Sequence, residues 1–220
     1  MIAQRGHGKI PKPIKLHFDT LAQSVQPSIP PDMLGLWPSL LSTADATLCF
    51  DRLLSELDWA QPELTVFGKN HPIPRMQSWL GDPAAHYTYS SRAFAPHPWH
   101  PLLKEWALAL SAFLNQPFNS VLANYYRDGN DKMGWHSDDE AELGPAPVIA
   151  MVSLGAEREL AFRTRTNSQS FKVSLPSGSL LVMGAGLQQR WQHGLPSRAR
   201  VSTGRISLTF RQIFPLSQGK

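Results

Sequence analysis

The spacing of apolar residues predicts two helices in the first half of the chain. Residues 43–57 place four leucines at roughly helical intervals, and Ser42 with Asp45 resembles an N-cap followed by an acid in the first turn. Residues 99–114 carry a second apolar stripe, with Pro101 in the first turn and Pro117 beyond the end. We therefore expect two amphipathic helices, each with one face against a core.

From about residue 119 the pattern changes to short apolar segments separated by turn residues such as Asp128-Gly129. The predicted strands are 121–126, 147–154, 159–163, 170–175, 179–183 and 204–213. Helices followed by short strands predict an α+β fold in which the helices buttress one face of an antiparallel sheet or jelly roll. Residues 1–41, rich in Pro, Lys and Ser, predict a basic, partly disordered N-terminal arm with a short strand late in it, followed by a single domain over 42–220.

The composition is that of a folded protein without a membrane span. With 42% hydrophobic residues in a chain of 220, there is enough apolar material for a sizeable core, which excludes a wholly disordered protein. No apolar stretch reaches the ~20 residues of a membrane helix, and the N-terminus lacks the apolar region of a secretory signal. The single cysteine, Cys49, excludes an internal disulfide and a cysteine-based zinc cage. We expect a bacterial cytoplasmic protein, or a nuclear one if the source is eukaryotic.

Positive charge is concentrated in the last third of the chain. Residues 151–220 carry ten Lys and Arg side chains against two acidic ones, although the net charge of the whole chain is only +4. A locally basic region suggests a polyanionic partner such as nucleic acid, but many soluble proteins are basic without one.

The segment around residue 136 contains candidate metal ligands. His136 and Asp138 are two residues apart, so an extended backbone places both side chains on one side. These are two of the three ligands of a 2-His-1-carboxylate triad, which leaves positions open on Fe(II). His193, which follows the predicted strand 179–183, is the best candidate for the third ligand. The pattern His136-x-Asp138 alone is common by chance, and its alternative is a solvated turn, so the interpretation as a metal site needs further support.

The last predicted strand supplies that support. Arg205, Ser207, Thr209 and Arg211 share one face, while the residues between them are apolar. Two guanidinium groups on the wall of a cavity match a dicarboxylate, although on an isolated strand they indicate an exposed edge. Asn124 and Tyr126 alternate in the same way and offer an amide and a phenol. Metal ligands and arginines together favour iron with 2-oxoglutarate.

These residues match a known family: the chain resembles the AlkB family of Fe(II)- and 2-oxoglutarate-dependent nucleic-acid demethylases from about Phe67 to Ile213. The matching segments are Asn124-x-Tyr126, Asp128-Gly129, His136-x-Asp138-Asp139-Glu140, Val152 to Ala156, Gly178 to Met183, His193 to Pro196 and Arg205-x-Ser207-x-Thr209-Phe210-Arg211. The resemblance implies a double-stranded β-helix (jelly-roll) core over 119–215, with the helices and a nucleotide-recognition region in 42–118.

The resemblance also implies roles for individual residues. The implied iron ligands are His136, Asp138 and His193, and the implied 2-oxoglutarate contacts are Asn124, Tyr126, Arg205, Ser207 and Arg211. Ser207 departs from the family, which usually has Asn there. The implied substrate contacts, most like those of the duplex-DNA-acting subgroup, are Phe67, Arg75, Trp79, Tyr87, Tyr89, Asp139 and Glu140. Phe67 matches a finger that fills the gap left by a flipped nucleotide. The alternative for Phe67 is a loop residue that folds back onto the core. The alternative for Asp139 and Glu140 is a solvated turn.

The expected activity is DNA repair with Fe(II), 2-oxoglutarate and O2. N1-methyladenine and N3-methylcytosine would be demethylated with release of formaldehyde, succinate and CO2. The expected partner is alkylated DNA or RNA, bound by a monomer without membrane contact, and the predicted phosphate contacts are Arg158, Arg163, Arg165 and Lys172. The alternatives are an RNA or protein-side-chain demethylase of the same family, a Zn(II) hydrolase using the same ligands, and a non-catalytic nucleic-acid-binding module.

Overall fold

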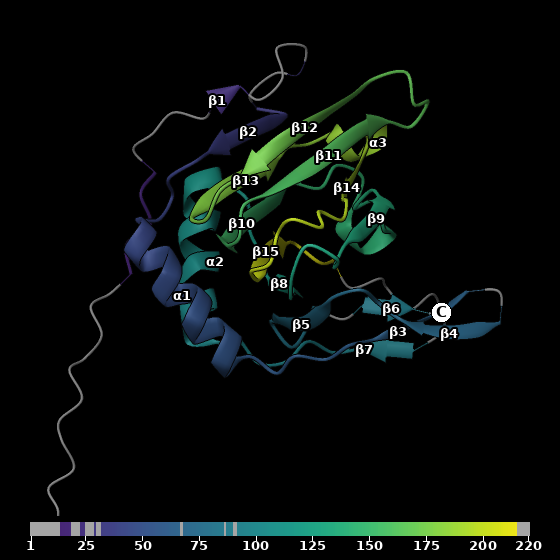
Figure 1. Ribbon diagram of the computed structural model, residues 1–220. Coiled ribbons are helices and arrows are strands. Elements are labelled where there is room, and N and C mark those ends of the chain that lie inside the picture. The colour runs from purple at the N-terminus through teal and green to yellow at the C-terminus, as the bar shows by residue number, and fades with distance from the viewer. Residues whose placement is uncertain are drawn as a thin grey trace, which may run out of the picture.

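Two antiparallel sheets form the body of the protein in a computed structural model that describes residues 14–18, 23–24, 29, 32–66, 68–85, 87–89 and 92–214 (Figure 1). The large sheet has the order β1 (Gln23–Ser24), β2 (Leu34–Trp37), β13 (Ser179–Met183), β10 (Ile149–Gly155), β15 (Arg205–Arg211), β8 (Ser120–Tyr126) and β5 (Met76–Gly81). The small sheet has the order β12 (Ser170–Leu175), β11 (Arg158–Thr164), β14 (Trp191–Leu195) and β9 (Met133–His136). The predicted α+β fold with a jelly-roll core is confirmed.

Two hairpins, one before and one after β5 in the sequence, lie below and to the right of the sheets in Figure 1. The first joins β3 (Glu63–Val66) to β4 (Lys69–Pro72), and the second joins β6 (Tyr87–Tyr89) to β7 (Arg92–Phe94). The described side chains of the first hairpin are exposed. Short segments of this kind, without apolar alternation, give no strand signal in the sequence.

The two predicted helices are α1 (Thr43–Glu56) and α2 (Pro101–Leu114), which cover one face of the large sheet (Figure 1). Ser42 caps α1, because its Oγ accepts a hydrogen bond from the backbone N–H of Asp45 at 3.1 Å. Beneath the helices lies a core that includes Leu53, Trp106 and Leu208. The remaining short helical segments are η1 (Ala141–Leu143) and α3 (Leu187–Arg190). No helix among the described residues is long and apolar enough to cross a membrane.

A second apolar core lies between the sheets, around Phe162, Ile149 and Leu181. Strand β15 contributes to both environments because its side chains alternate: Ile206, Leu208 and Phe210 join the core under the helices. Its polar residues therefore face the interior of the jelly roll, where their charge and hydrogen-bonding groups are sheltered from water.

Strand β2 shows that the sheet extends into the region predicted as the arm. Residues Leu34 to Trp37 pair with β13 and are buried. The predicted short strand late in the arm is thus present, and it belongs to the large sheet. The division of the chain at residues 41 and 42 stays a prediction, since residues 1–13 lie outside the described residues.

Candidate active site

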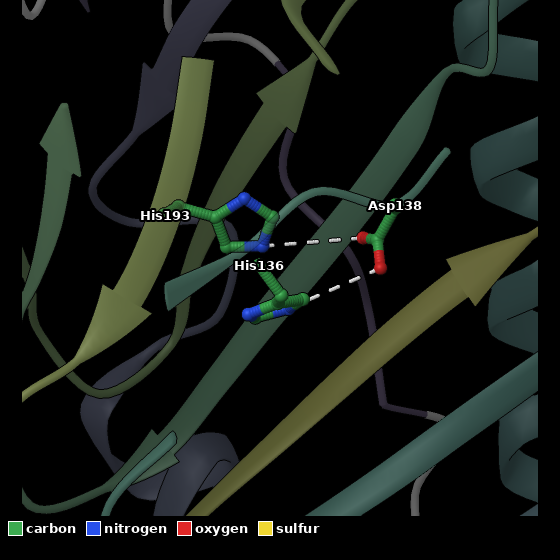
Figure 2. Close-up of side chains that lie close together, drawn as sticks. All are labelled: His136, Asp138 and His193. Carbon is green, nitrogen blue, oxygen red and sulfur yellow. Dashed lines mark ion pairs between the residues drawn. The ribbon is translucent and has the colours of Figure 1, made fainter. Parts of the chain in front are cut away.

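Three predicted metal ligands meet between the sheets. His136 ends β9, His193 lies directly opposite it on β14, and Asp138 follows β9 by two residues. One ligand atom from each lies within 4.8 Å of the others. Each histidine Nε2 is 4.0 Å from an oxygen of Asp138, and Figure 2 shows the two rings on one side of the carboxylate. The residues fit a divalent cation bound by two imidazoles and one carboxylate.

Two hydrogen bonds to residues of α3 and β14 fix the loop that carries Asp138. The backbone N–H of Asp138 donates to Gln188 Oε1 at 3.1 Å, and Ser137 Oγ donates to the carbonyl of Trp191 at 3.1 Å. Nδ1 of His136 is 3.0 Å from the carbonyl oxygen of Gly134. This contact favours the tautomer with a proton on Nδ1, which leaves Nε2 free to bind a metal. Gln188 carried no signal in the sequence, because its contact with Asp138 spans 50 residues.

The charges at the triad suit a cation. Burial alone would raise the pKa of Asp138, but the positive charge of Arg211 and the hydrogen bond that it donates lower it, so the carboxylate is ionised. Burial lowers the pKa of His193 to about 3, so its imidazole is neutral and able to bind a metal. Oδ2 of Asp138 is buried and has no hydrogen-bond partner among the described residues. A buried anionic oxygen of this kind requires a positive partner.

A cavity extends from the triad along the polar face of β15. Its walls include the predicted 2-oxoglutarate residues Asn124, Tyr126, Arg205, Ser207 and Arg211. Thr209 and the apolar side chains of Met133, Met151, Leu160 and Leu195 complete them. The apolar members were not predicted as site residues, because in a sequence they are indistinguishable from core.

Arg205 is the strongest sign of an anion in this cavity. Its side chain is 1% exposed, and its Nη2 donates to Ser153 Oγ at 2.8 Å. No carboxylate pairs with Arg205 in the described part of the chain, and its buried Nε has no hydrogen-bond partner there. Burial lowers its pKa to about 10, which still leaves it charged. Since an uncompensated buried charge is unfavourable, the cavity fits an anion such as a dicarboxylate.

A larger cavity of about 470 Å³ adjoins Arg211 on the side of β5. Trp79 and Glu140, both predicted substrate residues, line it together with Gln77, Leu122 and Ile213. Asp139 does not line it; its carboxylate is exposed and accepts a hydrogen bond from Arg165. Arg75 also lies elsewhere, with its Nε donating to Asn124 Oδ1 at 2.9 Å. Phe67 and the side chains of Tyr87 and Tyr89 lie outside the described residues.

The structure separates the four predicted phosphate contacts. Arg158 is 2% exposed and donates to the carbonyls of Asp128, Asp131 and Pro196, which speaks against a phosphate contact at this position. The other three have at least partly exposed side chains. Arg163 stacks over the ring of Trp135, Arg165 pairs with Asp139, and Lys172 lies 3.6 Å from Glu159.

Comparison with solved structures supports the fold. The chain is similar to the structure of OsALKBH1, with a TM-score of 0.55 and 22% identity over 86% of this chain and 100% of that one. It is also similar to an oxidoreductase of the 2OG-Fe(II) oxygenase family from Burkholderia pseudomallei, with a TM-score of 0.54 and 14% identity over 81% of this chain and 84% of that one.

Sequence comparison places the chain in a family. The 2OG-Fe(II) oxygenase superfamily matches residues 33–211. The chain is 39% identical to the DNA oxidative demethylase ALKBH2 of Mus musculus over 80% of this chain and 78% of the relative. It is 40% identical to the ALKBH2 of Homo sapiens over 79% of this chain and 71% of the relative. It is 34% identical to the alpha-ketoglutarate-dependent dioxygenase alkB homolog 3 of Rattus norvegicus over 84% of this chain and 65% of the relative. The chain therefore belongs to the AlkB family within the 2OG-Fe(II) oxygenase superfamily, and it is a dioxygenase whose cofactors are Fe(II) and 2-oxoglutarate.

Proposed function

We propose that the protein is a DNA oxidative demethylase that removes methyl groups from N1-methyladenine and N3-methylcytosine. The observation that carries the proposal is the meeting of His136, Asp138 and His193 beside a cavity that the two histidines line together with the uncompensated Arg205. The names of the mouse and human relatives, both DNA oxidative demethylases, support DNA as the substrate. The alkB homolog 3 relatives match almost as closely, and their name states no substrate. The proposal includes a preference for duplex DNA over single strands, which is tested separately below.

In this proposal Nε2 of both histidines and a carboxylate oxygen of Asp138 would hold the iron. Oδ1 of the same carboxylate is already engaged by Arg211 at 2.7 Å, so Oδ2 is the atom available to a metal. Bound iron would activate O2, the oxidant that is needed to break a methyl C–H bond and that no amino-acid side chain replaces.

The dicarboxylate occupies the cavity beside the metal, and its charges are matched by Arg205 and Arg211. Three further donors face the same space: the amide of Asn124 and the hydroxyls of Tyr126 and Ser207. Burial raises the pKa of Tyr126, so its phenol keeps its proton and acts as a donor. Ser207 has a shorter reach than the Asn usual in the family, which makes it the smallest contributor of the set.

The alkylated base enters the larger cavity. Trp79, Leu122 and Ile213 offer apolar walls to a flat ring, and Glu140 offers a carboxylate to its polar edge. Methylation at these ring positions blocks Watson–Crick pairing, which lowers the energy needed to flip the base out of a duplex. Phe67, between β3 and β4 in the sequence, would fill the gap that the base leaves. Arg163, Arg165 and Lys172 remain the candidate phosphate contacts.

The test is mass analysis of methylated oligonucleotides incubated with the protein, Fe(II), ascorbate and 2-oxoglutarate. Single-stranded DNA, duplex DNA and RNA are compared, and formaldehyde and succinate are measured in parallel. We expect loss of one methyl group per formaldehyde and per succinate, dependent on O2, with DNA the best substrate. The Asp138→Ala variant should be inactive. A zinc hydrolase would need neither O2 nor 2-oxoglutarate, and a better RNA or peptide substrate would overturn the assignment to DNA.

The duplex preference is tested separately with Phe67→Ala. Removing the side chain should reduce demethylation of duplex DNA more than that of single strands, because only a duplex leaves a gap to fill. Equal loss on both substrates would contradict the finger role while leaving demethylation intact.

A further inference from the structure

The amide of Asn124 is held in one orientation by two donors that converge on the same atom. Arg75 Nε donates to Asn124 Oδ1 at 2.9 Å, and Gln77 Nε2 donates to the same oxygen at 2.8 Å. Gln77 lies on β5 directly opposite Asn124 on β8, and Arg75 immediately precedes β5. Both contacts are sheltered, since Arg75 and Asn124 are only 9% and 4% exposed.

The chemistry of the groups determines which atom faces which. A guanidinium group has donors and no acceptor, so the atom of Asn124 that faces Arg75 must be its oxygen. Gln77 must then present its amide nitrogen to that oxygen as well. An amide oxygen has two lone pairs, and both are now occupied. The NH2 group of Asn124 is left for the cavity that Asn124 lines with His136 and Arg205.

We propose that Arg75 and Gln77 are positioning residues that hold the Asn124 amide with its NH2 group toward the 2-oxoglutarate pocket. Each of Asn124, Tyr126, Ser207 and the two arginines then offers the pocket a donor, and this set matches a ligand rich in acceptor atoms. Without the two donors the amide could turn over and present its oxygen to the ligand, which would repel a carboxylate. Arg75, predicted as a substrate contact, acts on the cosubstrate instead.

This inference rests on the proposed role of Asn124 as a 2-oxoglutarate contact. The test measures the dissociation constant of 2-oxoglutarate by calorimetry on the Mn(II)-loaded protein, so that no turnover is needed. Gln77→Leu should weaken 2-oxoglutarate binding about three- to tenfold, a factor that corresponds to the free energy of one ordinary hydrogen bond. Gln77→Glu, of the same shape but with an acceptor facing Oδ1, should weaken it further. Arg75→Met should also weaken 2-oxoglutarate binding and leave the affinity for a methylated oligonucleotide within about twofold of the parent.

A double-mutant cycle shows whether Gln77 acts through Asn124. In the Asn124→Ala background, Gln77→Leu should have no further effect on the dissociation constant, because there is no amide to orient. The matched control is Gln169→Leu, which replaces an exposed glutamine between β11 and β12 that lines neither cavity. Unfolding midpoints of every variant, measured without ligand, separate loss of fold from loss of orientation.

The outcomes distinguish the two proposals. If Gln77→Leu binds 2-oxoglutarate as tightly as the parent, or loses the same factor with and without Asn124, the positioning role is wrong. If Asn124→Ala itself has no effect on the dissociation constant, the proposed cosubstrate role of Asn124 is wrong, whatever Gln77 does.

Discussion

Arg211 donates from Nη2 to Oδ1 of Asp138 at 2.7 Å, while Oδ2 of that buried carboxylate has no partner among the described residues. The same arginine lines both the cavity beside the triad and the larger cavity next to it. One guanidinium group therefore borders the proposed positions of the metal, the cosubstrate and the base. The other oxygen, Oδ2, lies 4.0 Å from Nε2 of His193.

Replacing Arg211 with Met removes the charge that compensates the buried Asp138 carboxylate. We expect the metal-free variant to lose about 3 kcal/mol of unfolding free energy, as when one partner of a buried ion pair is removed. Added Mn(II) should restore part of the loss, because it binds the folded state through the same carboxylate. Denaturant unfolding with and without Mn(II) measures both quantities. Arg211→Lys, which keeps the charge, should lose less, and a metal-free Arg211→Met protein as stable as the parent would contradict the pairing.

Replacing Arg205 with Met should have the opposite effect on the ligand-free protein. The guanidinium is buried without a counter-ion, so its removal should leave the unfolding midpoint unchanged or raise it. Binding of 2-oxoglutarate should weaken about 100-fold, because a fully buried charge partner is lost. Thermal unfolding of the Mn(II)-loaded protein over a series of 2-oxoglutarate concentrations measures both. Arg200→Met, at an exposed position, is the control and should leave the ligand-induced shift intact. A shift of parental size in Arg205→Met would refute the anion site.

Arg158 should matter for stability and not for nucleic-acid binding. Its guanidinium donates to three backbone carbonyls in segments that are distant in sequence. Arg158→Met should cost about 3 kcal/mol, because buried carbonyls lose their donors. Arg163→Met, which removes a partly exposed side chain, should cost less than about 1 kcal/mol. Unfolding curves test the difference, and oligonucleotide affinity at several salt concentrations tests the other half. A reduced salt dependence in Arg158→Met would restore it as a phosphate contact.

The sequence predicted those features that depend on local alternation. The polar face of β15 and the common direction of His136 and Asp138 follow from the two-residue period of an extended chain. Both long helices follow from their apolar stripes and from the cap at Ser42. These signals lie within a few residues of one another, so no knowledge of the tertiary fold is needed to see them.

The features that the sequence did not predict depend on pairing between distant segments. Strands β9 and β14 have only four and five residues, and each carries a triad histidine, so neither was predicted as a strand. The burial of Arg158 is not visible in the sequence, because charged residues at strand ends are usually exposed and its acceptors lie in the distant loops around residues 128 and 196. The convergence of Arg75 and Gln77 on Asn124 likewise depends on the pairing of β5 with β8.

Gly129, in the predicted turn, is required for close packing between two loops. Its N–H donates to the carbonyl of Val201 at 2.7 Å, and its carbonyl accepts from the N–H of Arg198 at 2.6 Å. A Cβ at this position would lie 1.8 Å from the carbonyl oxygen of Arg198, which is backbone and cannot turn aside. Gly129→Ala should therefore destabilise the protein by about 2 kcal/mol or more. Gly134→Ala is the matched control, because among the described residues no atom beyond its chain neighbours lies within 4 Å of its Cβ position. Denaturant unfolding of both variants makes the comparison, and equal stability of the two would show that the loops can separate without loss of packing.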